Sequence, residues 1–137
     1  MGKNAEFEAV FARLREILLK HSGVLRVEHD AEDHFGLAST TGPATIAAWR
    51  GKMRSATIPV AWVKVGNSYV SYHLMGVYGN PKLLEGCSRE LRARMRGKSC
   101  FNFTKVDEKL MTELDGLVLQ SLTGMRKAGF IANNKGS

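Results

Sequence analysis

The side chains of this 137-residue chain that are best suited to binding chemistry alternate along one β-rich stretch. Two runs of β-forming residues, 59–65 and 68–74, flank a Gly-Asn pair at 66–67, which is typical of a tight hairpin because both residues tolerate positive φ. Side chains on a strand alternate between its two faces. One face of the predicted hairpin therefore carries Trp62, Lys64, Tyr69, Ser71 and His73. A wet aromatic face of this kind can bind a small ligand, a nucleobase or a partner protein.

A two-residue loop at 66–67 also determines which residues lie opposite each other in the hairpin. On the apolar face Val63 lies opposite Val70, and we expect helices to cover this face. On the polar face the predicted pairs are Lys64 with Tyr69, Trp62 with Ser71, and Val60 with His73. Aromatic cross-strand pairs also stabilise sheets that bind nothing, so the pattern leaves both interpretations open.

Acidic residues and histidines gather at 28–34, a segment (EHDAEDH) with four acids and no lysine or arginine. If the segment folds back on itself, His29, Asp33 and His34 could converge on a divalent ion. The segment lacks the helical histidine spacing of zinc enzymes, however, and an acidic loop can be simply solvated. We therefore predict no metal site and no cofactor, and we keep these three residues as weak candidates for metal ligands.

A basic segment at 88–98 (SRELRARMRGK) carries a net charge of +4. We predict a helix capped by Ser88, with Leu91 and Met95 turned toward the core. Its basic side chains could track the phosphates of a polyanion such as a nucleic acid; they are Arg89, Arg92, Arg94, Arg96 and Lys98. The alternative is that these charges form the solvated face of a helix that packs on the core.

Motifs for catalysis are sparse. The Gly-Lys-Ser step at 97–99 ends like a phosphate-binding loop, but Arg92 occupies the position of that loop's first glycine. Cys100 lies near Lys98, yet the local sequence places no histidine or aspartate beside it. Cys87 is predicted to pack as a small apolar residue. We therefore favour a protein that is not an enzyme, with a small enzyme of unknown reaction as an alternative.

Periodic apolar residues predict two long helices, one over 4–20 and one along a stripe from Leu110 to Met125. Besides the hairpin, shorter strands are predicted at 34–40, 45–50 and 100–103. Two helices with one apolar face each must cover a sheet. The sequence thus predicts an α+β fold, with an antiparallel sheet and the helices packed on one of its faces.

Composition is that of one basic globular domain, with a net charge of +7 and a pI near 9.7. We expect a core over about 4–130 and a flexible tail at 131–137. No apolar run approaches the ~20 residues that span a membrane. Residues 1–8 do not resemble a signal peptide and two cysteines make no disulfide framework, so we expect a cytoplasmic protein.

Two segments resemble the YdhG-like domains, a family of small bacterial proteins mostly of unknown function. They are 64–84 (KVGNSYVSYHLMGVYGNPKLL) and 97–103 (GKSCFNF), and the likeness covers roughly residues 30–125. The resemblance implies a small α+β domain with helices on one side of an antiparallel sheet. Some relatives are described as frataxin-like iron chaperones, which implies iron as a possible cargo. Frataxin-type iron handling uses an acidic helix or ridge, whereas this chain is basic.

Three hypotheses follow. The leading one is a binding or chaperone-like domain that uses the open aromatic face for a small ligand, a metal cargo or a protein partner. The second is weak binding of a polyanion or nucleic acid through the basic segment 88–98, and the third is a small enzyme. No membrane partner is predicted. The aromatic face could also pair two copies, so we expect a monomer or a homodimer.

Overall fold

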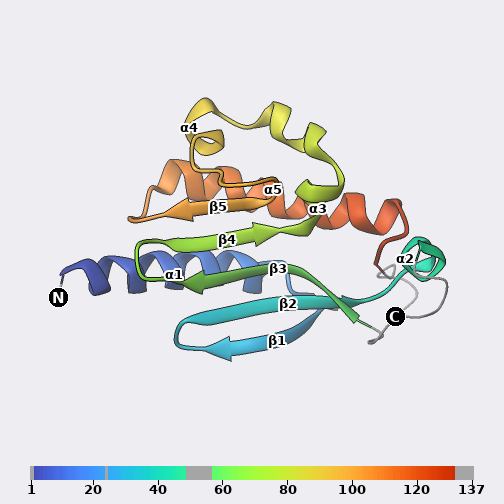
Figure 1. Cartoon of the computed structure of the whole chain (residues 1–137), viewed down its shortest axis with the longest axis horizontal. Coiled ribbons are helices and arrows are strands. Elements are labelled where there is room, and N and C mark those ends of the chain that lie inside the picture. The colour runs from blue at the N-terminus through green and yellow to red at the C-terminus, as the bar shows by residue number, and fades with distance from the viewer. Residues whose placement is uncertain (1, 24, 49–56, 132–137) are drawn as a thin grey trace.

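The computed structural model describes residues 2–23, 25–48 and 57–131 and has an α+β fold (Figure 1). Its antiparallel sheet has five strands in the order β1-β2-β3-β4-β5. The strands are β1 (Arg26–Ala31), β2 (His34–Thr40), β3 (Thr57–Val65), β4 (Val70–Leu74) and β5 (Cys100–Phe103). The helices are α1 (Gly2–Lys20), α2 (Pro43–Ala48), α3 (Met75–Gly79), α4 (Arg89–Arg92) and α5 (Glu108–Lys127), with a 3-10 helix η1 (Pro81–Gly86).

The two long helices lie behind the sheet in Figure 1, so that they cover only one of its faces. The predictions of helices over 4–20 and along 110–125 are confirmed by α1 and α5. The apolar stripe of α1 is buried, as is that of α5, where Asp107 caps the first turn by accepting from the N–H groups of Lys109 and Leu110. In the described ranges no helix has the length and apolar character that crossing a membrane requires.

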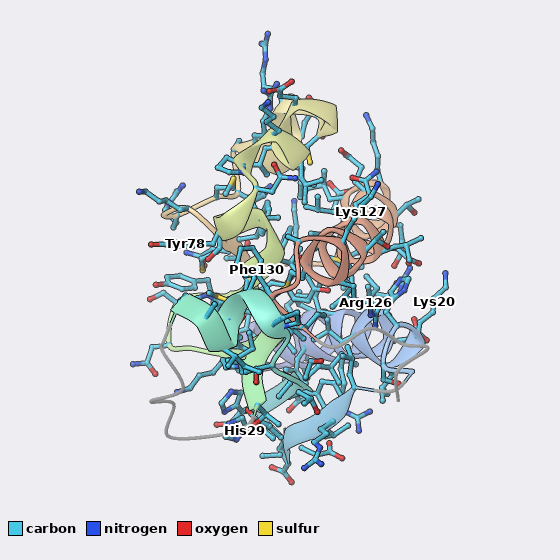
Figure 2. The ribbon with its side chains drawn as sticks, turned by 90° about the vertical axis from the view of Figure 1, so that its right-hand side faces the viewer. Lys20, His29, Tyr78, Arg126, Lys127 and Phe130 are labelled. Carbon is cyan, nitrogen blue, oxygen red and sulfur yellow. The ribbon has the colours of Figure 1, made fainter. Side chains whose placement is uncertain are left out.

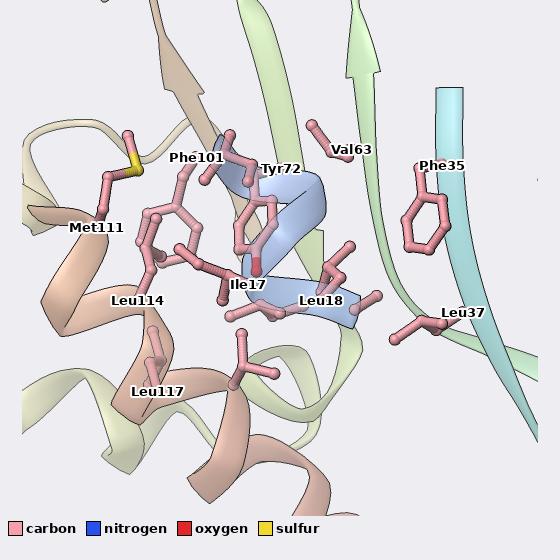
Figure 3. Close-up of a cluster of buried hydrophobic side chains, with 14 of the residues drawn as sticks. Ile17, Leu18, Phe35, Leu37, Val63, Tyr72, Phe101, Met111, Leu114 and Leu117 are labelled. Carbon is pink, nitrogen blue, oxygen red and sulfur yellow. The ribbon is translucent and has the colours of Figure 1, made fainter. Parts of the chain in front are cut away.

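The core fills the space between this covered face and the two helices. Figure 3 shows side chains of β2, β3, β4 and β5 meeting those of α1 and α5. On β3, β4 and β5 the buried Val63, Tyr72 and Phe101 alternate with exposed or half-buried neighbours. This period of two is the pattern of a sheet with one buried face and one open face.

The β3–β4 hairpin forms, but its predicted register is wrong by two residues. The tight turn is centred on Asn67 and Ser68, because the Gly66 N–H donates to the Tyr69 carbonyl at 2.8 Å. His73 therefore lies opposite Trp62. A shift of two residues returns every side chain to the face on which it was predicted. The faces of the hairpin were thus predicted correctly from an incorrect turn.

Val60 is the exception to this alternation. Leu37 pairs with Ala61 while the next residue of β2, Ala38, pairs with Pro59, so Val60 is an extra residue in β3. A bulge of this kind turns the bulged strand and breaks the alternation. Val60 is consequently buried in the core, and the prediction that it lies opposite His73 on the polar face is wrong.

The basic segment is less helical than predicted. Ser88 caps α4 as expected, since its Oγ accepts from the Leu91 N–H, but α4 ends at Arg92. Residues 94–96 then run along the free edge of β5, where Met95 bridges to Phe101. This extended segment satisfies backbone groups that an uncovered edge strand would leave exposed.

A strand predicted at 45–50 is also wrong where the structure describes it, because residues 43–48 form α2. Pro43 suits the first turn of a helix, and the alanines that follow favour helix over strand. Helix α2 packs on the segment that follows α5, where the Thr45 hydroxyl donates to the Phe130 carbonyl at 2.6 Å. Ile131 is buried and bridges to Thr41, so the prediction that the flexible tail begins at residue 131 is wrong at this residue. Residues 49–50 and 132–137 lie outside the described ranges.

Charged side chains join α1 to α5 on the helical side of the molecule. Arg13 contacts Glu108, and Asp115 accepts from Lys20 at 2.8 Å and from His21 at 2.5 Å. Although partial burial raises the pKa of Asp115, the hydrogen bonds from Lys20 and His21 outweigh it and lower that pKa. The ionised form of Asp115 is therefore favoured in the folded protein.

The pKa of Asp115 leads to a prediction about stability in acid. A carboxyl group with a lowered folded pKa stabilises the protein above its unfolded pKa of about 4, and this contribution is lost as the pH falls through the folded pKa. Asp115→Asn should lower the free energy of unfolding by about 1 kcal/mol at neutral pH and by nothing once the carboxyl is protonated. Urea unfolding across this pH range measures the difference; a deficit that persists in acid would contradict the prediction.

Tyr72 leads to a second prediction. Its hydroxyl is buried without a hydrogen-bond partner among the described residues, and Figure 3 shows the ring pointing from β4 toward Ile17 and Leu18. Burial raises the pKa of Tyr72, so the phenol stays neutral. Because an unpaired buried hydroxyl costs free energy, Tyr72→Phe should raise the free energy of unfolding by about 1 kcal/mol in urea denaturation. A loss of stability would mean that the hydroxyl is paired in solution.

Candidate functional site

The face of the sheet that α1 and α5 leave uncovered is called the open face here, and strand pairing arranges it into two rows. Residues directly opposite each other in an antiparallel sheet share a face, so each row can be followed from strand to strand. The aromatic row consists of His29, Gly36, Trp62, His73 and Cys100. The polar row beside it consists of Ala31, His34, Lys64, Ser71 and Asn102.

Trp62 and His73 form the centre of the aromatic row. Their rings stack with centroids 4.6 Å apart and planes inclined by 14°. Because this separation is close to the spacing of neighbouring strands, both rings stand edge-on to the sheet. One face of the indole is covered by the imidazole of His73. The other face looks along the row toward β2, where Gly36 has no side chain.

Gly36 forms the floor of a hollow of about 230 Å³ beside that indole face. On the far side the rings of His29 and His34 stack at 4.2 Å. We call this hollow the slot; it is lined by Trp62, Gly36, His29, His34, Pro59 and Glu28, among others. A Cβ at position 36 would lie 3.3 Å from the Trp62 Cβ and 3.5 Å from the His29 Cδ2. The slot is therefore open to its full depth because residue 36 is glycine.

Cys100 and His73 end the aromatic row as a contacting pair. The Cys100 Sγ lies 3.5 Å from the His73 Nε2 and 3.5 Å from the Asn102 Oδ1. Burial raises the pKa of the Cys100 thiol, an effect that a backbone hydrogen bond at Tyr72 only partly offsets. Burial also lowers the pKa of His73. Both shifts favour a neutral thiol beside a neutral imidazole, not the thiolate and imidazolium of an activated nucleophile.

The three weak metal candidates lie at the β1–β2 hairpin. His29 and His34 stack face to face, so the lone pairs in their ring planes run side by side and do not converge on one point. Burial, followed by the charges of His29 and Lys64, lowers the pKa of His34. Asp33 is in the turn, where its carbonyl accepts from the Val65 N–H. In the parts of the chain that the structure describes, no three His, Cys, Asp or Glu side chains gather as metal ligands would.

The structure brings together four of the five residues predicted for the open face. Trp62, Lys64, Ser71 and His73 lie in adjoining positions of the two rows. The fifth, Tyr69, is exposed at the turn, where its carbonyl accepts from Gly66, instead of opposite Lys64. Of the basic side chains, Arg89 and Arg92 are exposed on α4, whereas Arg94, Arg96 and Lys98 follow it.

Sequence reasoning missed three residues of the open face: Gly36, Cys100 and Asn102. Each joins the site only through the pairing of strands that are distant in the sequence. A glycine within a predicted strand can mark the close approach of a ligand, and that was the available signal for Gly36. The alternation in the predicted strand 100–103 could have separated Cys100 and Asn102 from Phe101 and Phe103, but it could not say which strand they adjoin.

A scan against protein-family models and searches of curated proteins and solved structures found no significant match to this chain. The likeness to the YdhG-like domains therefore stays a prediction.

The Cys100–His73 pair leads to a prediction about thiol reactivity. With Cys87→Ser as background, Cys100 should react with a small disulfide reagent at neutral pH more slowly than free cysteine does, because only the thiolate attacks. The rate should rise with pH and reach its midpoint above the ordinary cysteine pKa. The same variant unfolded in urea gives the uninhibited rate. A reaction at neutral pH faster than that of free cysteine would instead identify an activated Cys–His pair.

Proposed function

We propose that this protein is a non-enzymatic binding domain whose open face holds the planar ring of a ligand in the slot. The observation that carries the proposal is the free face of Trp62 above Gly36. A ring placed there stacks on an indole that His73 already holds upright, so little side-chain freedom is lost on binding. The pair His29 and His34 bounds the same space from the other side.

The size of the slot supports a ring in preference to a larger body. Its volume of about 230 Å³ is below the ~300–1,000 Å³ of pockets that enclose a whole drug-sized ligand. A single ring system can fill such a space, with the remainder of the ligand lying along the sheet. Beyond the slot, toward β5, the polar row of the open face offers a cation at Lys64 and hydrogen-bonding groups at Ser71 and Asn102.

Protonation supports binding over catalysis. The only nucleophile that the aromatic row places beside a base is Cys100, and burial holds both it and His73 in their neutral forms. Neutral imidazole and thiol groups donate and accept hydrogen bonds without starting covalent chemistry. Transport of an iron cargo, which the resemblance would imply, has less support from this face, because hard oxygen ligands are sparse on it.

The proposal predicts a response of Trp62 to planar rings. Adenosine, uridine and indole at millimolar concentration should shift the Trp62 indole N–H resonance in two-dimensional NMR, whereas cyclohexanol, a saturated ring, should not. Trp62→Phe identifies this resonance among those of the two tryptophans. If no planar ring shifts it, the proposed function is wrong.

Gly36→Ala tests whether the slot is the binding position. The added methyl would lie 3.3 Å from the Trp62 Cβ, so the two strands must separate by a few tenths of an ångström, and it would occupy the floor of the slot. We expect affinity for the planar rings to fall about tenfold, with a loss of thermal stability corresponding to about 1 kcal/mol while the fold is retained. Gly116→Ala is the matched control, since a Cβ at that position of α5 meets nothing within 4 Å. Equal affinities of the two variants would place the ring elsewhere.

A further inference from the structure

We infer that the ring held in the slot is a base of single-stranded nucleic acid, whose backbone crosses β3, β4 and β5 to cations at the far edge of the sheet. This inference rests on the proposed function and names its ligand. It joins the aromatic face and the basic segment, which the sequence presented as separate hypotheses, into one surface.

The first observation is the course of residues 94–96 along β5. The Arg96 N–H donates to the Cys100 carbonyl at 2.9 Å, and the Asn102 N–H donates to the Arg94 carbonyl at 2.8 Å. Met95, between the two arginines, packs against the core. Because side chains alternate along an extended segment, Arg94 and Arg96 project on the side of the open face. Arg96 thereby extends the aromatic row and Arg94 extends the polar row.

The second observation is the distribution of paired and unpaired charge. The ion pairs of the described residues lie mainly on the helical side, where Arg13, Arg15 and Lys20 meet acidic partners. The cations of the open face have no acidic partner within the described chain, and these are Lys64, Arg94, Arg96 and Lys98. Unpaired cations beside an aromatic platform complement a ligand that is both anionic and aromatic.

Lys98 and Tyr78 add a second aromatic and basic element to this surface. The Lys98 Nζ lies 6.0 Å from the centre of the Tyr78 ring, and Tyr78 is 55% exposed. Figure 2 shows Tyr78 and His29 on one side of the molecule and Lys20 and Lys127 on the other. The open face thus presents aromatic rings at the slot and again near its basic edge.

The length of this surface favours a single-stranded nucleic acid over a single nucleotide as the ligand. From the slot above β2 to residues 94–96 there are four strand spacings, or about 19 Å. One nucleotide carries its base and its phosphate too close together to reach both ends. A chain of several nucleotides bridges them, with a base in the slot and phosphates near Arg94 and Arg96. A duplex does not fit, because its stacked and paired bases cannot enter the slot.

The experiment is fluorescence anisotropy of the full chain with labelled single strands of about 12 nucleotides, as RNA and as DNA. Neutralising four phosphates of a single strand should weaken binding about 50-fold between roughly 50 mM and 200 mM salt. Duplex of the same sequence, heparin and mononucleotides are the competitors. Each competitor should displace the labelled single strand much less effectively than the same unlabelled single strand does. Comparing the RNA and DNA single strands identifies which nucleic acid is preferred.

Two variants test separately the stacking of a base on Trp62 and the contacts of phosphates with Arg94 and Arg96. Trp62→Ala should weaken strand binding about 5- to 150-fold, the range for loss of one stacked base, without changing the salt dependence. Arg94→Gln with Arg96→Gln should reduce the loss over the same salt range to about 7-fold. Lys105→Gln with Lys127→Gln is the matched control, because it removes the same charge near the two ends of α5 from exposed lysines that, like the two arginines, have no acidic partner in the described chain. Gly36→Ala repeats the test of the slot without removing Trp62.

The outcomes are distinct. If planar rings bind the slot but no strand binds, the nucleic-acid inference is wrong and the proposed function stands. If neither binds, both are wrong. If heparin or duplex competes as well as strand, or if Trp62→Ala and Gly36→Ala both leave strand affinity unchanged, the surface binds polyanions without using a base, which overturns the inference. An equal effect of the α5 control variant would overturn it as well.

Discussion

The burial of one face of the sheet beneath α1 and α5 is the constraint on which the rest of the molecule depends. Most of the apolar volume of the chain, including Tyr72, Phe101 and the stripes of both helices, lies in that single layer. Both long helices pack on this face, and within the described chain no long helix covers the opposite face of the sheet. The same alternation that supplies the core therefore leaves every second side chain of the strands for interaction.

Strand pairing then turns isolated residues into a surface. Trp62, His73 and Cys100 come from three different strands, and only their register places them in one row. The row is held by backbone hydrogen bonds, so its side chains need little further ordering. Gly36 is as important as the rings, since its missing side chain keeps one face of Trp62 free.

Charge is arranged according to the same division into two faces. On the helical side Arg13, Lys20 and His21 contact carboxylates, and these pairs join α1 and the residue that follows it to α5. On the open side the cations near β5 are unmatched, while the acids of the β1–β2 hairpin lie toward the opposite edge. The net charge of +7 therefore does not show how unevenly positive and negative charges are distributed across the open face. A field of this form orients an anionic ligand along the sheet.

The sequence by itself determined the two long helices, most strands and the face on which the hairpin residues other than Val60 lie, because periods of 3.6 and 2 depend only on local geometry. It did not determine the turn of the hairpin, the bulge at Val60 or the end of α4 at Arg92, since these depend on pairing with distant residues. Only the tertiary structure decided that Cys100 contacts His73 and that the backbone of Arg96 and Arg94 adjoins Cys100 of the aromatic row and Asn102 of the polar row. The physical reason is that cross-strand neighbours are set by the register of the whole sheet, which no single segment encodes.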